Sequence, residues 1–206
     1  MVIYSYVVTR DYGFAPNPFF GYCTLATCKP KIRKNAQVGD WVIGIGSSAQ
    51  NSKFKNKLIY AMRIEEKLLF NDYWNDTRFN KKKPVMNGSN KQLYGDNIYH
   101  KNLNSEGFTQ ENSHHSLENG RVNEINHKKD LSGDYVLISK NFWYFGEDAI
   151  QIPNRLKGII HSGIGHSKYD DKSLIDKFIT WINEKDPNII GKPKSFSGEF
   201  VRYKGE

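Results

Sequence analysis

The stretch TRDYGFAPNPFFGYCTLATCKPKIRKNAQVGDWVIGIGS, residues 9–47, decides the fold that the sequence predicts. It follows a β-branched and aromatic run over residues 2–8 that is typical of a buried strand. Prolines and glycines then predict an aromatic loop, since proline fixes its backbone and glycine permits turns. A short basic helix over residues 29–36 and a Gly-Asp turn lead into a second strand over residues 41–45. This order indicates an α+β domain.

The remaining chain also alternates strands and helices. Apolar patterns predict strands over residues 57–66, 135–139, 142–145 and 149–152, the middle two forming a hairpin around Lys140-Asn141. Helical spacing predicts helices over residues 68–79 and 173–184. We therefore expect a single domain over residues 1–206, in which a small curved mixed or antiparallel sheet carries flanking helices.

Two stretches differ in composition from the rest. Residues 80–131 are polar and Asn-rich, and a structureless loop of that length is unusual in a compact domain. They predict a polar insertion with short elements of its own, folded over one face. Residues 191–206 form a basic tail rich in Gly, Pro and Ser.

The charge balance favours a polyanionic partner. The chain has 30 Lys and Arg against 22 Asp and Glu, for a formal net charge of +8. Basic side chains that contact phosphates release counterions, which favours nucleic acid or a nucleotide as the ligand. No run approaches the roughly 18 apolar residues that span a bilayer, so no membrane is expected. The two cysteines make no disulfide framework, and we expect free thiols in the cytoplasm.

The aromatic loop and its basic flanks form the candidate ligand site. Aromatic faces stack unpaired bases, and nearby cations suit phosphates. The alternative is that these rings fill the core beneath a long connection. Glycines in the strand over residues 41–46 allow close approach of a ligand or of another strand. The expected ligand-binding residues are Arg10, Phe14, Asn17, Phe19, Tyr22, Lys29, Arg33, Trp41 and Ser47.

Candidates for catalysis are scattered along the sequence. Cysteines 23 and 28 do not make a CxxC pair, and no histidine spacing predicts a metal site, so neither a metal nor a cofactor is expected. A thiolate is conceivable beside Lys29, whereas buried free cysteines are commoner. The sequence HSGIGHS (residues 161–167) could cradle a phosphate, but that signal is weak. The catalytic candidates are Cys23, His115 and His161, with Asp96 and Asp130 as orienting carboxylates.

The quoted stretch resembles the opening of the nucleotide modification associated domain 2 family. Similar pieces follow in KLIYAMRIEEKLLFNDYWNDTRF (57–79), GDNIYH (95–100), HSLENG (115–120) and YVLISKNFWYFG (135–146). The resemblance implies a phage or bacterial protein associated with modified nucleotides, without catalytic residues to carry over. Ile164 stands where a more polar residue is expected, which weakens a phosphate role for that loop. The element order also resembles PUA-like domains, including the EVE type, in which a curved sheet holds a base in an aromatic pocket.

Three functions follow as hypotheses. A module that recognises a modified base needs an aromatic pocket and a basic rim, and residues 10–48 supply both. An enzyme that adds to or processes a modified base needs a titratable pair within hydrogen-bond reach, which requires distant loops to converge. A partner-binding protein in host defence conflict is the third. The oligomeric state is left open.

Overall fold

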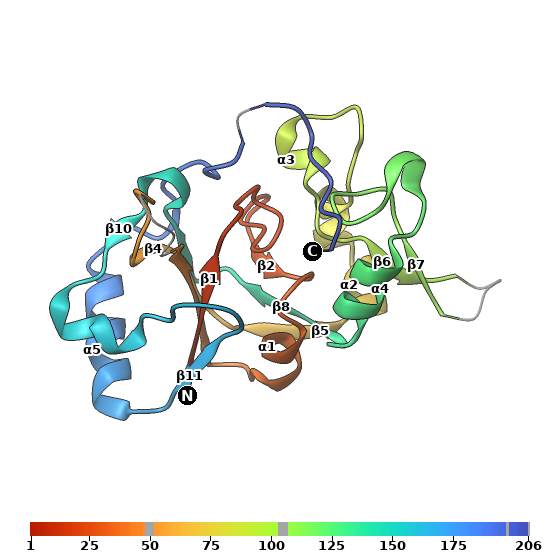
Figure 1. Ribbon diagram of the computed structural model, residues 1–206. Helices are drawn as coiled ribbons and strands as arrows, with labels where there is room; N and C mark the ends of the chain where they lie inside the picture. The colour runs from red at the N-terminus through yellow and green to blue at the C-terminus, as the bar shows by residue number, and fades with distance from the viewer. Residues whose placement is uncertain (48–51, 103–106, 197, 206) are drawn as a thin grey trace. The chain divides into compact units, whose positions relative to one another are not determined.

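The computed structural model describes residues 1–47, 52–102, 107–196 and 198–205. The chain divides into two compact units, each assembled from three separate stretches (Figure 1). Unit 1 contains Met1–Asp11, Ala36–Glu66 and Ser139–Ser195. Unit 2 contains Tyr12–Asn35, Lys67–Ile138 and Phe196–Glu206.

Unit 1 is built on a mixed sheet. Its strands are β1 (Ile3–Val8), β3 (Trp41–Gly46), β4 (Lys57–Arg63), β9 (Phe142–Tyr144), β10 (Ile150–Gln151), β11 (Ser167–Tyr169) and β12 (Asn188–Ile189). They are ordered β11-β1-β3-β4-β9-β12, and β10 pairs with β4. Strands β1 and β3 are parallel, with Ile3 opposite Trp41, whereas β4 is antiparallel to β3. The Gly-Asp turn before β3 is fixed by Asp40, whose carboxylate accepts the N–H groups of Val2 and Gln37.

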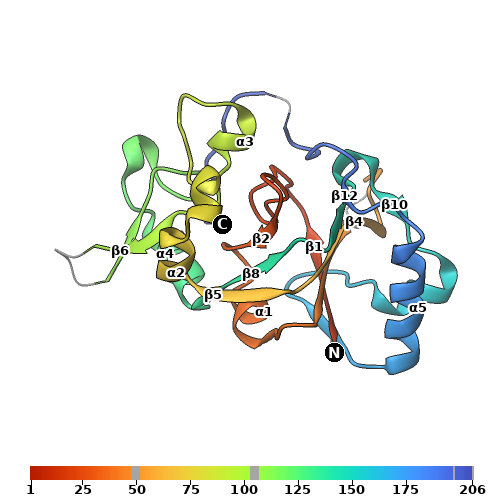
Figure 2. The ribbon, with the colours of Figure 1, turned by 180° about the vertical axis from the view of Figure 1, so that it is seen from behind.

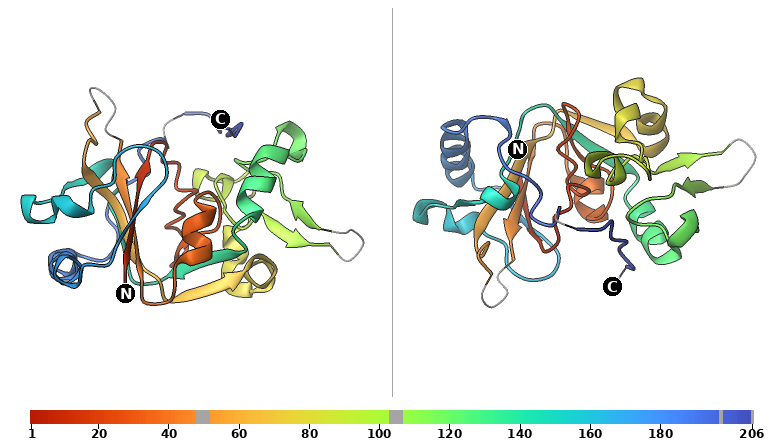
Figure 3. Two further views of the ribbon diagram at one scale, coloured as in Figure 1. Left: turned by 60° about the horizontal axis from the view of Figure 1, so that its bottom comes forward. Right: turned by 90° about the horizontal axis from the view of Figure 1, so that it is seen from above.

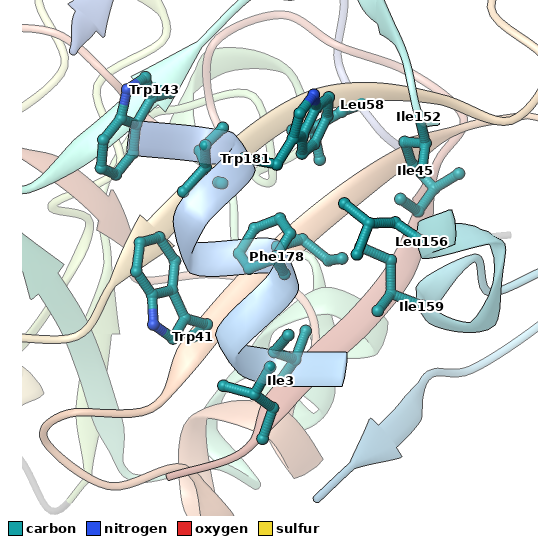
Figure 4. Packing of buried hydrophobic residues seen from close by; sticks show 14 of the residues in the cluster. Ile3, Trp41, Ile45, Leu58, Trp143, Ile152, Leu156, Ile159, Phe178 and Trp181 are labelled. Atoms are coloured by element: carbon teal, nitrogen blue, oxygen red, sulfur yellow. The ribbon is translucent and has the colours of Figure 1, made fainter. Parts of the chain in front are cut away.

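Helix α5 (Lys172–Asn183) and the 3₁₀ turn η4 (Asn154–Ile159) cover one face of this sheet (Figures 2 and 3). The core between them contains Phe178 of α5, whose ring lies edge-on to Trp41 at 5.3 Å (Figure 4). Trp41 also stacks on Trp143. A Cβ at Gly44 would lie 2.5 Å from the Tyr60 ring, so packing between strands accounts for that glycine.

Unit 2 has a smaller sheet and short helices. It contains the three-stranded sheet β2-β8-β5, except for the end residues Glu66 and Ser139, which belong to unit 1. Strands β6 and β7 form an antiparallel hairpin. Its strands are β2 (Cys23–Leu25), β5 (Glu66–Leu69), β6 (Tyr99–Lys101), β7 (Phe108–Gln110) and β8 (Tyr135–Ser139). Its helices are α1 (Pro30–Asn35), α2 (Phe70–Asn75), α3 (Asn90–Leu93) and α4 (Glu124–Leu131), with 3₁₀ turns η1 (Thr77–Lys82) and η2 (Glu118–Gly120); η3 (Gly146–Asp148) lies in unit 1.

The architecture confirms the α+β class, with a mixed open sheet and few helices. The predicted hairpin over residues 135–145 is wrong, because β8 and β9 belong to different sheets. The connection between them bonds elsewhere: the N–H groups of Lys140 and Asn141 donate to the Glu65 carboxylate. In the described part of the chain, no helix is long and apolar enough to cross a membrane.

Candidate active site

Cys28 lies in a strained turn between β2 and α1. Its φ is +56° and that of Lys29 is +39°, and a non-glycine residue in this left-handed region costs about 1–2 kcal/mol. Two contacts hold the turn: the Cys28 N–H donates to Asp130 Oδ1 at 2.7 Å, and Arg33 Nε donates to the Cys28 carbonyl at 2.8 Å. The thiol is half-buried, whereas that of Cys23 is buried in β2. A strained turn that presents a partly accessible nucleophile is common at functional sites.

His115 connects the Cys28 thiol to a buried carboxylate. Its Nε2 lies 3.6 Å from Cys28 Sγ, and its Nδ1 lies 2.6 Å from Asp130 Oδ2. The three side chains are separated by 87 and 15 residues in sequence. They form the order nucleophile, base and orienting acid that defines a catalytic triad by geometry.

Asp130 is held by further donors. The Tyr99 hydroxyl donates to Oδ2 at 3.0 Å, and Gln110 Nε2 in turn donates to Tyr99 at 2.9 Å. Gln110 also donates to the His115 carbonyl, so the β6–β7 hairpin fixes both members of the acid–base pair. One carboxylate therefore accepts bonds from the His115 imidazole and from the backbone of Cys28.

The electrostatics of the pair favour a charged imidazole. Burial alone would lower the pKa of His115, but the Asp130 carboxylate and then Cys28 raise it to about 10. Burial likewise opposes ionisation of Asp130, yet His115 and Arg33 hold the pKa of that carboxyl below its usual value. At neutral pH both imidazole nitrogens carry protons, one bonded to Asp130 and the other facing the Cys28 sulfur.

The same three side chains have the chemistry of metal ligands, with donor atoms within 4.8 Å of one another. Their orientation fits a metal poorly, because the imidazole lies between the thiol and the carboxylate with one nitrogen facing each. Both Asp130 oxygens already accept hydrogen bonds. The arrangement is that of a proton relay, since metal ligands converge on one point.

Arg33 and Lys29, expected to bind a phosphate, take different positions. Arg33 is fully buried, and its guanidinium donates to the backbone carbonyls of Cys28, Asp130, Gly133 and Tyr135. It therefore joins α1 to the end of α4. Lys29 remains half-buried beside the thiol. The pKa of its ammonium group is lowered, mainly by burial and also by the charge of Lys129, although Cys28 acts in the opposite direction.

The aromatic loop packs around this site and around a second polar network. Phe14 is 3% exposed, and its ring lies 4.7 Å from that of His115. Phe19 is buried against Phe196. The ring of Tyr22, which is half-buried, contacts Phe79. The side chain of Asn17 accepts a bond from buried Lys82 and donates to the Tyr94 carbonyl.

The other candidate residues lie elsewhere. Asp96 is buried in unit 2, where it accepts the hydroxyls of Thr24 and Tyr73. Four candidates belong to unit 1: Arg10 is exposed, Trp41 is in the core, Ser47 follows β3, and His161 bonds to Ser167 Oγ.

The structure thus brings His115 and Asp130 together and joins them to Cys28 instead of Cys23. The available signal for Cys28 was its place beside Lys29, just before a helix. Nothing in the sequence indicated that Tyr99 and Gln110 belong to the site, because their contacts with Asp130 and His115 depend on a hairpin that a single sequence does not reveal.

Comparison with known proteins places the chain by sequence. Neither curated proteins nor solved structures give a match, so the PUA-like architecture stays a prediction. The model of one family, described as nucleotide modification associated domain 2, matches residues 1–200, which include Cys28, His115 and Asp130. This match confirms the resemblance seen in the sequence motifs. The chain belongs to the nucleotide modification associated domain 2 family.

Proposed function

We propose that the protein is a cysteine-dependent acyl-transfer enzyme that processes an amide or ester group on a modified nucleotide. The observation that carries the proposal is the continuous contact from Cys28 Sγ through His115 to Asp130. A cationic imidazole beside a thiol favours the nucleophilic thiolate. The orienting carboxylate keeps the imidazole in line, as in other triads.

The chemistry follows from the positions of these atoms. The Cys28 sulfur attacks the acyl carbon and forms a C–S bond, while the bond to the leaving amine or alcohol breaks. His115 gives its Nε2 proton to that leaving group and becomes neutral. Water then adds to the thioester, its proton returns to His115, and the thiolate departs from the acid product. Asp130 holds the ring through both steps.

A nucleotide as substrate is supported by the family and by charge. The family description connects the domain to nucleotide modification. Lys29 lies beside the thiol. Lys129 is close enough to Lys29 to lower the pKa of the Lys29 ammonium group further. A lysine beside the thiol, with a second cation near that lysine, suits a substrate that carries phosphate.

Alkylation of Cys28 tests the nucleophile without knowledge of the substrate. In a Cys23→Ser background, Cys28 is the only thiol, and its rate with iodoacetamide is followed by intact mass from pH 5 to pH 9. We expect the rate near neutral pH to fall by about tenfold or more in His115→Gln, because the imidazolium is lost. An unchanged profile in His115→Gln would overturn the proposal.

A second candidate is recognition of a modified base without chemistry. The half-buried rings of Tyr12 and Tyr22 in unit 2 favour it, since partly exposed rings can stack a base. Incubation with nucleotides bearing amide-linked base modifications separates the two functions. The enzyme forms an acyl adduct in the wild type and none in Cys28→Ser. A reader forms no adduct in either, and Tyr12→Ala weakens its binding.

A further inference from the structure

Residues 200–205, here called the strap, bond to the loop that carries the catalytic base. Arg202 makes the most polar contacts: its guanidinium donates to the Ser113 carbonyl at 2.7 Å, to Ser116 Oγ at 2.8 Å and to Asn112 Oδ1 at 2.8 Å. These acceptors lie on both sides of His115 in sequence. A planar guanidinium that bonds both ends of a short loop fixes its conformation.

Tyr203 approaches the base more closely. Its N–H donates to the His114 carbonyl at 2.7 Å, and its ring centroid lies 5.4 Å from that of His115. Its carbonyl accepts from Asn126 Nδ2 at 2.7 Å. The same amide nitrogen donates to the His115 carbonyl at 3.0 Å, so Asn126 connects the strap to the base.

The base and the strap are buried together. His115 is 2% exposed, and Asn126 is fully buried in the first turn of α4, the helix that also supplies Asp130. The family match ends at residue 200, so Arg202 and Tyr203 lie beyond it. The support for His115 in this chain therefore includes residues outside the matched region.

We propose that Arg202 and Tyr203 are positioning residues, and that the strap holds His115 in line between Cys28 and Asp130. The inference rests on the proposed nucleophilic role of Cys28. The strap touches neither the sulfur nor the carboxylate in the contacts described above. Its effect passes through the 112–116 loop, and displacement of a catalytic group by about 1 Å can cost on the order of 100-fold in rate.

The test compares two strap variants that each remove one positive charge. Arg202→Ala loses the bonds to the loop. Lys204→Ala is the matched control, because its side chain is exposed and the bond from Asn123 goes to its carbonyl, which the substitution keeps. Both are made in the Cys23→Ser background, and the pH profile of Cys28 alkylation is measured. We expect about a tenfold loss at pH 7 in Arg202→Ala, with a profile like that of His115→Gln, and less than a twofold change in Lys204→Ala.

Further variants separate positioning from folding. Arg202→Lys, which keeps the charge, should recover part of the rate. Tyr203→Leu keeps the backbone bonds and tests the ring if Arg202→Ala fails to fold, as judged by circular dichroism. Its rate should lie between those of Arg202→Ala and the wild type.

The outcomes distinguish the two proposals. If His115→Gln changes the profile while Arg202→Ala and Tyr203→Leu keep that of the wild type, only the strap proposal is wrong. It is also wrong if Lys204→Ala behaves like Arg202→Ala, because charge alone would then explain the effect. If His115→Gln itself has no effect, the proposed function fails first.

Discussion

At the scale of single residues, the left-handed backbone at Cys28 has a measurable cost. Glycine adopts this conformation freely, so Cys28→Gly should be more stable than Cys28→Ala by about 1 kcal/mol. Urea unfolding measures the difference. The matched control is Cys23, which lies in the strand β2, where glycine should be less stable than alanine by about 0.5–1 kcal/mol. The same order at both positions would contradict a strained turn at Cys28.

A second prediction concerns the charge on His115. The pKa of His115 is about 10 in the folded protein, compared with 6.5 for an ordinary histidine. Its stabilising contribution is therefore complete below about pH 6.5 and is lost as the pH rises through about 10. Between pH 7 and pH 9 the wild type should lose on the order of 1–3 kcal/mol more unfolding free energy than His115→Gln. Urea unfolding at both pH values measures this difference, and parallel losses would argue against an imidazolium.

At the scale of elements, Arg33 is the side chain that joins α1 to the end of α4. Removal of its guanidinium leaves buried carbonyls without donors, so Arg33→Ala should lose about 3–5 kcal/mol of unfolding free energy. Lys31→Ala removes an exposed cation from the same helix and should change stability by less than about 0.5 kcal/mol. Equal effects of the two variants would show that Arg33 is not structural.

Elements with strong local patterns could be predicted from the sequence. The two strands β1 and β3 and the amphipathic helix α5 follow from hydrophobic periodicity, whereas the parallel pairing of the two strands appears only in the fold. The hairpin over residues 135–145 failed, because the choice of sheet depends on long-range partners such as Glu65. The predicted helix over residues 68–79 is in fact the end of β5, α2 and part of η1.

The site residues, too, could be predicted where residue type is enough and could not where long-range contacts decide. His115 and Asp130 could be nominated by residue type, because a histidine and a carboxylate are the groups that such chemistry needs. The choice between Cys23 and Cys28 depended on burial and on backbone geometry, which appear only in the fold. Arg33 looked like a phosphate ligand because a sequence does not reveal that a basic side chain is buried.

At the scale of the whole molecule, burial makes the solvent-facing charge more positive than the sequence suggests. Among the described residues, the buried carboxylates are those of Asp11, Asp40, Asp96 and Asp130, whereas the buried lysines and arginines are Arg33 and Lys82. The surface that meets a ligand therefore carries a larger excess of cations than the formal +8.

That charge gives a prediction for nucleic acid. Binding of a short single-stranded DNA should weaken with salt, and the double variant Lys29→Gln/Lys129→Gln should reduce the slope of log affinity against log salt by about 2. The control is Lys172→Gln/Lys177→Gln, which removes the same charge from α5 in unit 1. Fluorescence anisotropy measures both. Equal reductions would indicate that the whole surface attracts DNA, without a preferred site beside Cys28.

The interleaving of the two units affects how the protein is made. The first 66 residues contain parts of both units, so neither can be completed early in synthesis on the ribosome. The thiol of Cys28 leaves the ribosome long before its partners His115 and Asp130, and Arg202 and Tyr203 follow after them. A nascent chain therefore exposes Cys28 before the imidazole and the carboxylate that join it in the folded protein have been made.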